Sequence, residues 1–176
     1  VGHQITAFQI KEKQMLTPVE IAALVAATKG TIDIFDKIAG QVKSVLLKRP
    51  KEAEGEEDRW RNKISAEGND IVVKQTGRTI QTITGGQLAS ALGSDDLALV
   101  RTYEQKMQQY FKRWQAIYAK KDSSQDPLVN VITEEQLTEQ ITKMKTELLG
   151  ILSFLEHIGV HLDDHYMNIR HLVEAV

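Results

Sequence analysis

The sequence predicts a mainly α-helical protein, an elongated bundle of three long helices with a small inserted antiparallel β-hairpin or meander. Apolar residues recur at helical spacing over three long segments. Between the first two of these lies a segment rich in Ile, Val and Thr that is interrupted by glycine turns. A length of 176 residues suits one folded unit, so we expect residues 1–176 to form a single helical domain.

The first helix is expected over residues 17–48. The stretch `TPVE` supplies Thr17 as N-cap, Pro18 at the first helical position and Glu20 three residues after the cap, which together form a typical helix start. Pro50 ends the pattern, and the acidic stretch `KEAEGEED` after it has the composition of a solvated linker.

The apolar arc of this first helix is unusually wide. Ile34, Ile38 and Val45 extend it to about half of the helix cylinder, which is more than one neighbouring helix usually covers. We therefore expect the helix either to be central in the bundle or to face a partner.

The β insert is expected over residues 62–84. Its strands are punctuated by `EGND` and `QTGRT`, which are turn sequences. Two or three short strands are not stable alone in water, so this unit is expected to pack on the helices.

The second long helix is expected over residues 95–121, with Ser94 or Asp95 as its cap. One stripe of this helix carries half of the aromatic side chains of the chain: Tyr103, Tyr110, Phe111, Trp114 and Tyr118. Rings beside basic residues are also typical of single-strand nucleic-acid platforms. Arg101 and Lys112, however, lie on the opposite side of the helix from the rings, which favours a packing role for the rings and argues against nucleic acid.

The third long helix is expected over residues 133–175, because Thr133 with Gln136 resembles a capping box and near-heptad apolar spacing follows it. The apolar phase continues through Gly159, which favours one continuous helix, kinked at that glycine. The alternative is that Gly159 ends one helix and Asp163 caps another, since an interior glycine costs about 1 kcal/mol.

Charge favours an antiparallel pairing of the last two helices. Residues 95–121 contain six Lys or Arg against three Asp or Glu, whereas residues 122–176 contain three against ten. Complementary rims would align the two helices, although each exposed ion pair contributes only about 0–1 kcal/mol.

Four of the five histidines lie between Leu155 and Glu174. On a continuous helix His157, His161 and Asp164 share one stripe, and an i,i+4 histidine pair is able to bind Zn²⁺. The stretch `HIGVH` has Ile where a zinc protease has its general-base Glu. This stripe points away from the apolar seam, so we interpret it as a solvated helix face and keep a His/Asp metal site as an alternative.

The composition favours no enzyme class, and we predict no cofactor. There is no cysteine, which excludes disulfides and thiolate sites and fits a cytoplasmic location. No apolar run approaches the roughly 20 residues that span a bilayer. Because the chain begins with Val1, we expect it to be a fragment or a processed product.

The function that these features favour is non-enzymatic: a protein–protein interaction or assembly module, an adaptor or scaffold that self-associates through amphipathic helices. The side chains expected to contact the partner or second copy are apolar residues of the first and last helices: Ile34, Ile38, Val45, Leu155, Leu162, Tyr166 and Ile169. The alternative is a membrane-active protein, in which the first helix, with its many small and apolar residues, leaves the bundle for a membrane surface.

Overall fold

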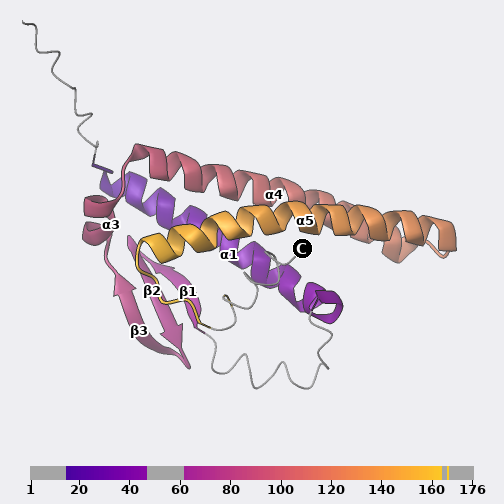
Figure 1. Ribbon diagram of the computed structural model, residues 1–176, viewed down its shortest axis with the longest axis horizontal. Coiled ribbons are helices and arrows are strands. Elements are labelled where there is room, and N and C mark those ends of the chain that lie inside the picture. Colours follow the sequence, from indigo (N-terminus) through magenta and orange to yellow (C-terminus); the bar gives the residue numbers. More distant parts are fainter. Residues whose placement is uncertain (1–14, 47–61, 164–165, 167–176) are drawn as a thin grey trace, which may run out of the picture.

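The computed structural model describes residues 15–46, 62–163 and 166, without the side chains of residues 38–46 and 122. This part of the chain forms three long helices, one short helix and a three-stranded sheet (Figure 1). The expected mainly helical fold with a small antiparallel sheet is therefore confirmed. The predicted helix end at Pro50 and the acidic linker lie outside the described residues.

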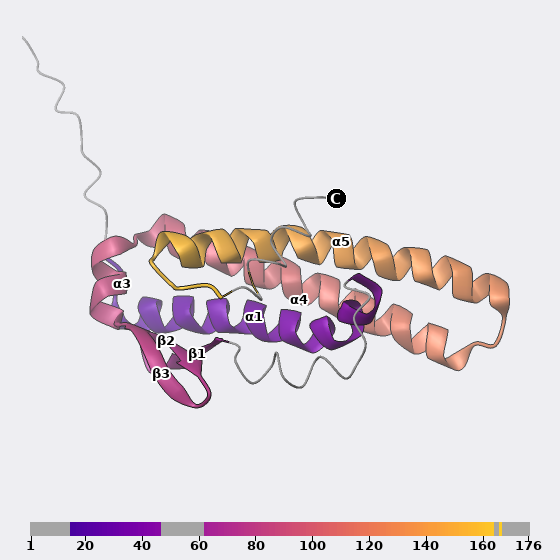
Figure 2. The ribbon, with the colours of Figure 1, turned by 60° about the horizontal axis from the view of Figure 1, so that its bottom comes forward.

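Helix α1 spans Pro18–Leu46 and begins as the sequence predicts. The backbone N–H of Thr17 donates to Glu20 Oε1 (3.1 Å), and the backbone N–H of Glu20 donates to Thr17 Oγ1 (3.2 Å). These reciprocal bonds satisfy donors that a helix start otherwise leaves unpaired. The helix then runs through the middle of the structure, between the sheet on one side and α4 and α5 on the other (Figure 2).

The sheet is a meander in the order β1-β2-β3, with β1 at Lys63–Glu67, β2 at Asp70–Gln75 and β3 at Arg78–Ile83. Both central residues of the second turn have positive φ, 51° at Thr76 and 79° at Gly77. This backbone matches the right-handed twist of a tight antiparallel hairpin. A register shift opposite Val73 and Lys74 gives the edge strand β3 an extra residue, Ile80.

A short helix that the sequence analysis did not predict, α3 at Gly85–Ala91, follows the sheet. The side chains of Thr84 and Gln87 cap it reciprocally: the backbone N–H of Gln87 donates to Thr84 Oγ1 (3.2 Å), and that of Thr84 donates to Gln87 Oε1 (2.9 Å). Gly85 is required here because a Cβ atom on it would lie 2.8 Å from the Cβ of Asn69.

Helix α4 spans Ser94–Ser123. Its N-cap is Gly93 rather than the expected Ser94 or Asp95, and the backbone N–H of Gly93 donates to Asp96 Oδ2 (2.7 Å). The predicted range of 95–121 is therefore nearly correct at both ends.

Helix α5 spans Pro127–His157, so the predicted range of 133–175 is wrong at both ends. The helix starts at Asp126, whose Oδ1 accepts a hydrogen bond from the backbone N–H of Leu128 (3.0 Å), with Pro127 at the first helical position. Thr133 is an interior residue whose hydroxyl donates to the carbonyl oxygen of Val129 (2.8 Å).

The other end of α5 corrects the prediction of a continuous helix. Gly159 has φ of 92°, a left-handed conformation that an L-residue rarely adopts, and the backbone N–H of Val160 donates to the Leu155 carbonyl (2.9 Å). Asp163 Oδ1 then accepts from the backbone N–H of Tyr166 (3.3 Å). The break at Gly159 is therefore the alternative that the structure adopts, whereas most of the second helix that Asp163 was expected to cap lies outside the described residues.

Two polar side chains hold the segment after α5 on the sheet. Gln81 of β3 donates from Nε2 to the Gly159 carbonyl (2.6 Å) and accepts at Oε1 from the backbone N–H of His161 (2.8 Å). Asp163 Oδ2 also accepts from the backbone N–H of Asn62 (2.6 Å). Val160 and Tyr166 are thereby positioned in the core, where they are buried.

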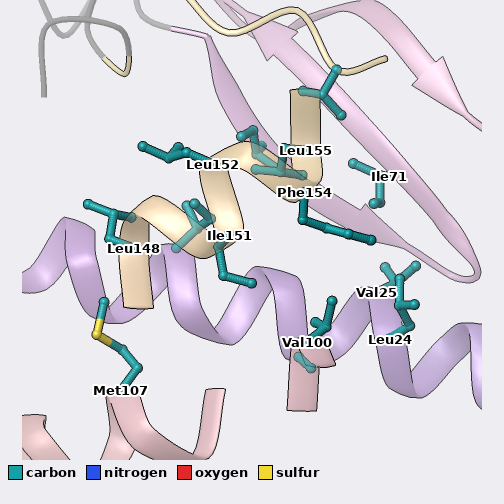
Figure 3. Close-up of a cluster of buried hydrophobic side chains, with 14 of the residues drawn as sticks. Leu24, Val25, Ile71, Val100, Met107, Leu148, Ile151, Leu152, Phe154 and Leu155 are labelled. Atoms are coloured by element: carbon teal, nitrogen blue, oxygen red, sulfur yellow. The ribbon is translucent and has the colours of Figure 1, made fainter. Parts of the chain in front are cut away.

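The core lies where α1, α4, α5 and the sheet meet (Figure 3). Apolar side chains from all of these elements converge there: Leu24, Val25, Ile71, Val100, Met107, Leu148, Ile151, Leu152, Phe154 and Leu155. Burial of this much apolar surface explains why the three-stranded sheet and the short α3, neither of which is stable alone, form here.

Candidate interaction surface on the α4–α5 hairpin

Helices α4 and α5 form an antiparallel hairpin whose inward residues follow steps of three and four (Figure 2). On α4 these buried or half-buried residues are Val100, Tyr103, Met107, Tyr110, Trp114, Ile117 and Lys121. On α5 they are Thr133, Leu137, Gln140, Met144, Glu147, Ile151 and Phe154. This spacing keeps one stripe of each helix facing its neighbour. Of the predicted aromatic stripe, Tyr103, Tyr110 and Trp114 therefore face α5, whereas Tyr118 is 37 % exposed.

Polar residues interrupt the α5 side of this seam. Gln140 and Glu147 are each 6 % exposed, and Gln140 Oε1 is buried without a hydrogen-bond partner in the described structure. Burial raises the pKa of the Glu147 carboxyl above its ordinary value, and the nearby Lys106 cation partly opposes that rise. The hairpin seam is thus less stabilising than an apolar seam of the same length.

Close packing fixes the two helices against each other near the base of the hairpin. A Cβ atom on Gly150 of α5 would lie 2.5 Å from two ring carbons of Tyr103 on α4, so only glycine leaves room for this ring. Further along, the Trp114 ring stacks between Phe111 and Tyr118, with centroid distances of 6.1 Å and 5.2 Å. At the far end, Lys121 of α4 pairs with Glu134 of α5 (3.1 Å).

The far end of the hairpin reaches beyond the described end of α1 in both views (Figures 1 and 2). Three apolar residues of α5 are exposed there: Leu128 by 68 %, Val131 by 55 % and Ile132 by 48 %. Their spacing of three and four places them on one stripe, centred about 180° around the helix from the buried Leu137. We call these three residues the distal apolar cluster. It lies on the outer edge of α5, directed away from α4.

Charge is segregated between the two helices in this half of the hairpin. Residues 105–121 contain five bases and no acid: Lys106, Lys112, Arg113, Lys120 and Lys121. Residues 127–142 contain three acids and no base: Glu134, Glu135 and Glu139. This half of the hairpin is therefore basic along α4 and mainly acidic along α5, where Glu139 also pairs with Lys143 one turn further along the helix (2.9 Å).

Most of the predicted interaction residues that the structure describes are located in the core. Ile34, Leu155 and Tyr166 are buried within the chain, and Leu162 is half-buried. The side chains of Ile38 and Val45, and all of Ile169, lie outside the described residues. Of the predicted residues that the structure describes, Ile34, Leu155 and Tyr166 are therefore not accessible to a partner in this conformation.

The predicted histidine stripe does not form as one helical face. His157 is the last residue of α5, and His161 follows the left-handed Gly159, so the two are not an i,i+4 pair on a helix. Both histidines are exposed, and Asp164 lies outside the described residues. Across the described ranges, no group of three or more His, Cys, Asp or Glu side chains is arranged to hold a metal ion.

Sequence reasoning missed the distal apolar cluster because it began α5 at residue 133. The signals were present: Asp126 before Pro127 is a typical cap and first helical residue, and the cluster itself has helical spacing.

Comparison with known proteins identifies no relative. No family model matches the chain, and no curated protein or solved structure is significantly similar to it. In the described part of the chain, no helix combines the length and apolar character that crossing a membrane requires.

Proposed function

We propose that this chain is a non-enzymatic interaction and assembly module that self-associates through the distal end of the α4–α5 hairpin. The observation that supports the proposal is the distal apolar cluster. Leu128, Val131 and Ile132 are three large apolar side chains that project from one stripe, about half or more exposed, where the hairpin extends past the described end of α1. Contiguous exposed apolar surface of this kind marks interaction sites.

Because three of the predicted partner-facing residues are buried, we place the proposed contact at side chains that the structure shows to be exposed. Ile34, Leu155 and Tyr166 serve the internal core, whereas the cluster leaves apolar surface exposed to solvent. The segment around the cluster is also a regular helix, which presents the side chains in a fixed geometry and lowers the entropic cost of association.

The membrane-active alternative requires a large rearrangement. Ile21, Leu24 and Ile32 of α1 are almost completely buried against the rest of the chain, so α1 reaches a membrane only if the core opens. The metal alternative rested on the helical histidine pair, which the turn at Gly159 separates. The membrane-active and metal-dependent alternatives are therefore less well supported than assembly.

The test compares two matched substitutions. Ile132 and Ile80 are 48 % and 50 % exposed, but Ile132 belongs to the cluster and Ile80 lies on β3. We expect Ile132→Glu to weaken concentration-dependent association, measured by light scattering after gel filtration, because it inserts a charge into an apolar contact. Ile80→Glu should leave association unchanged. Equal association of both variants and the wild type would exclude the cluster as the contact.

A further inference from the structure

We infer that the cluster packs on α4 of a second copy, so that the outer edge of α5 in one copy lies along the outer edge of α4 in the next. This inference rests on the proposed self-association and specifies its partner surface. The two edges complement each other in size and in charge.

The size complementarity involves two alanines. Ala116 and Ala119 are exposed on α4 and point away from the inward Trp114, on the edge opposite to α5. Small side chains allow a neighbouring helix to approach closely, and the larger Leu128, Val131 and Ile132 are the side chains that need such a surface. Bulky residues on one edge thus meet small residues on the other.

The charge complementarity involves the residues that flank these apolar patches. Glu135 and Glu139 follow the cluster along the same stripe of α5, and both are exposed. Lys112 and Arg113 lie one turn from Ala116 on α4, and both are exposed. Acidic side chains on one edge and basic side chains on the other favour the pairing and also set its direction.

The heights of these residues along the hairpin agree with a contact between parallel hairpins. The Lys121–Glu134 pair fixes which residues of α4 and α5 lie level in one copy. If the second copy is displaced along the hairpin by about one helical turn, ~6 Å, Ala119 comes level with Ile132 and Lys112 with Glu139. One shift therefore satisfies the apolar contact and the charged contact together.

Symmetric pairings of like edges are less favourable. Two α5 edges would bring Glu135 and Glu139 of one copy toward the same acids of the other. Two α4 edges would bring Lys112 and Arg113 together and leave both clusters exposed. Pairing of unlike edges is head-to-tail, so it produces a ring or an open row of hairpins rather than a closed two-fold dimer.

The test reverses each charged edge separately. One variant carries Glu135→Lys with Glu139→Lys, and the other carries Lys112→Glu with Arg113→Glu. Sedimentation velocity at low salt measures the mass of each variant, of their equimolar mixture and of the chain that carries all four substitutions. Arg78→Glu, an exposed reversal on β3, is the control for a change in net charge, and circular dichroism checks folding.

We expect each double variant to associate at least about tenfold more weakly than the wild type, because like charges then face each other at the contact. Mixing the two should restore association that grows as the wild type does, because the native α4 edge of one variant meets the native α5 edge of the other and the two reversed edges also carry opposite charges. The fourfold variant should associate again, because the charges are exchanged rather than lost.

Two results would overturn the inference in different ways. If the wild type associates and both double variants associate equally well, the edge-to-edge contact is wrong while self-association stands. If the wild type is monomeric at every concentration, the proposed self-association fails and the inference fails with it.

Discussion

At the scale of single residues, the seam of the hairpin contains a buried carboxyl that should make stability depend on pH. Burial raises the pKa of Glu147 in the folded state, so the folded protein holds this proton more tightly than the unfolded chain. The corresponding stability is fully present below the unfolded pKa and is lost as pH rises through the raised folded pKa.

Glu147→Gln should therefore stabilise the protein relative to wild type at neutral pH, and the difference should shrink toward the unfolded pKa of about 4.3. Urea unfolding at several pH values, at low protein concentration, measures this difference. Glu135→Gln is the control, because Glu135 is exposed on the same helix. A difference that stays constant from acid to neutral pH would contradict the account.

Gly150 gives a second prediction at this scale. Alanine normally stabilises a helix interior relative to glycine by about 1 kcal/mol. At Gly150 the new methyl group would overlap the Tyr103 ring, so we expect Gly150→Ala to destabilise the protein by about 1–3 kcal/mol.

Gly30→Ala is the matched control in α1, because its new methyl group would meet only the flexible carboxylate end of Glu104. Denaturant unfolding compares the two variants. If both change the free energy of unfolding equally, the close packing of Tyr103 on Gly150 does not carry the stability that we assign to it.

At the scale of elements, the start of α1 could be predicted from the sequence, whereas the start of α3 and the two ends of α5 could not. The `TPVE` start of α1 and the turns of the sheet formed as expected, because short-range hydrogen bonds and glycine conformations determine them. Apolar spacing continues through Gly159, so it does not indicate the break. The hydrogen bonds that hold the segment after the break join residues distant in sequence, Gln81 to Gly159 and Asn62 to Asp163.

The end of α5 is tested by Gly159→Ala. An L-residue in the left-handed conformation of Gly159 costs roughly 1–2 kcal/mol, so the variant should be less stable by that amount with unchanged helix content. Thermal unfolding followed by far-ultraviolet circular dichroism measures both quantities. Greater helix content without loss of stability would instead support a continuous helix.

At the scale of the whole molecule, the sequence was informative about the elements and less so about which apolar faces remain exposed. A stripe such as Leu155 and Tyr166 has the same spacing whether it packs inside its own chain or on a partner, and here both side chains are buried inside. The wide apolar arc of α1 is likewise compatible with packing inside the chain or on a partner, and the described part of α1 lies in the middle of the structure. The cluster at Leu128 became recognisable only once the start of α5 was known.

The most direct test of the central claim is the mass of the wild-type protein in solution, measured by sedimentation across a wide range of concentration at low and high salt. We predict a mass that exceeds the 19.8 kDa of one chain, increases with concentration and decreases as salt screens the two charged edges. A mass of 19.8 kDa at every concentration and salt would contradict the proposal that this hairpin assembles the protein.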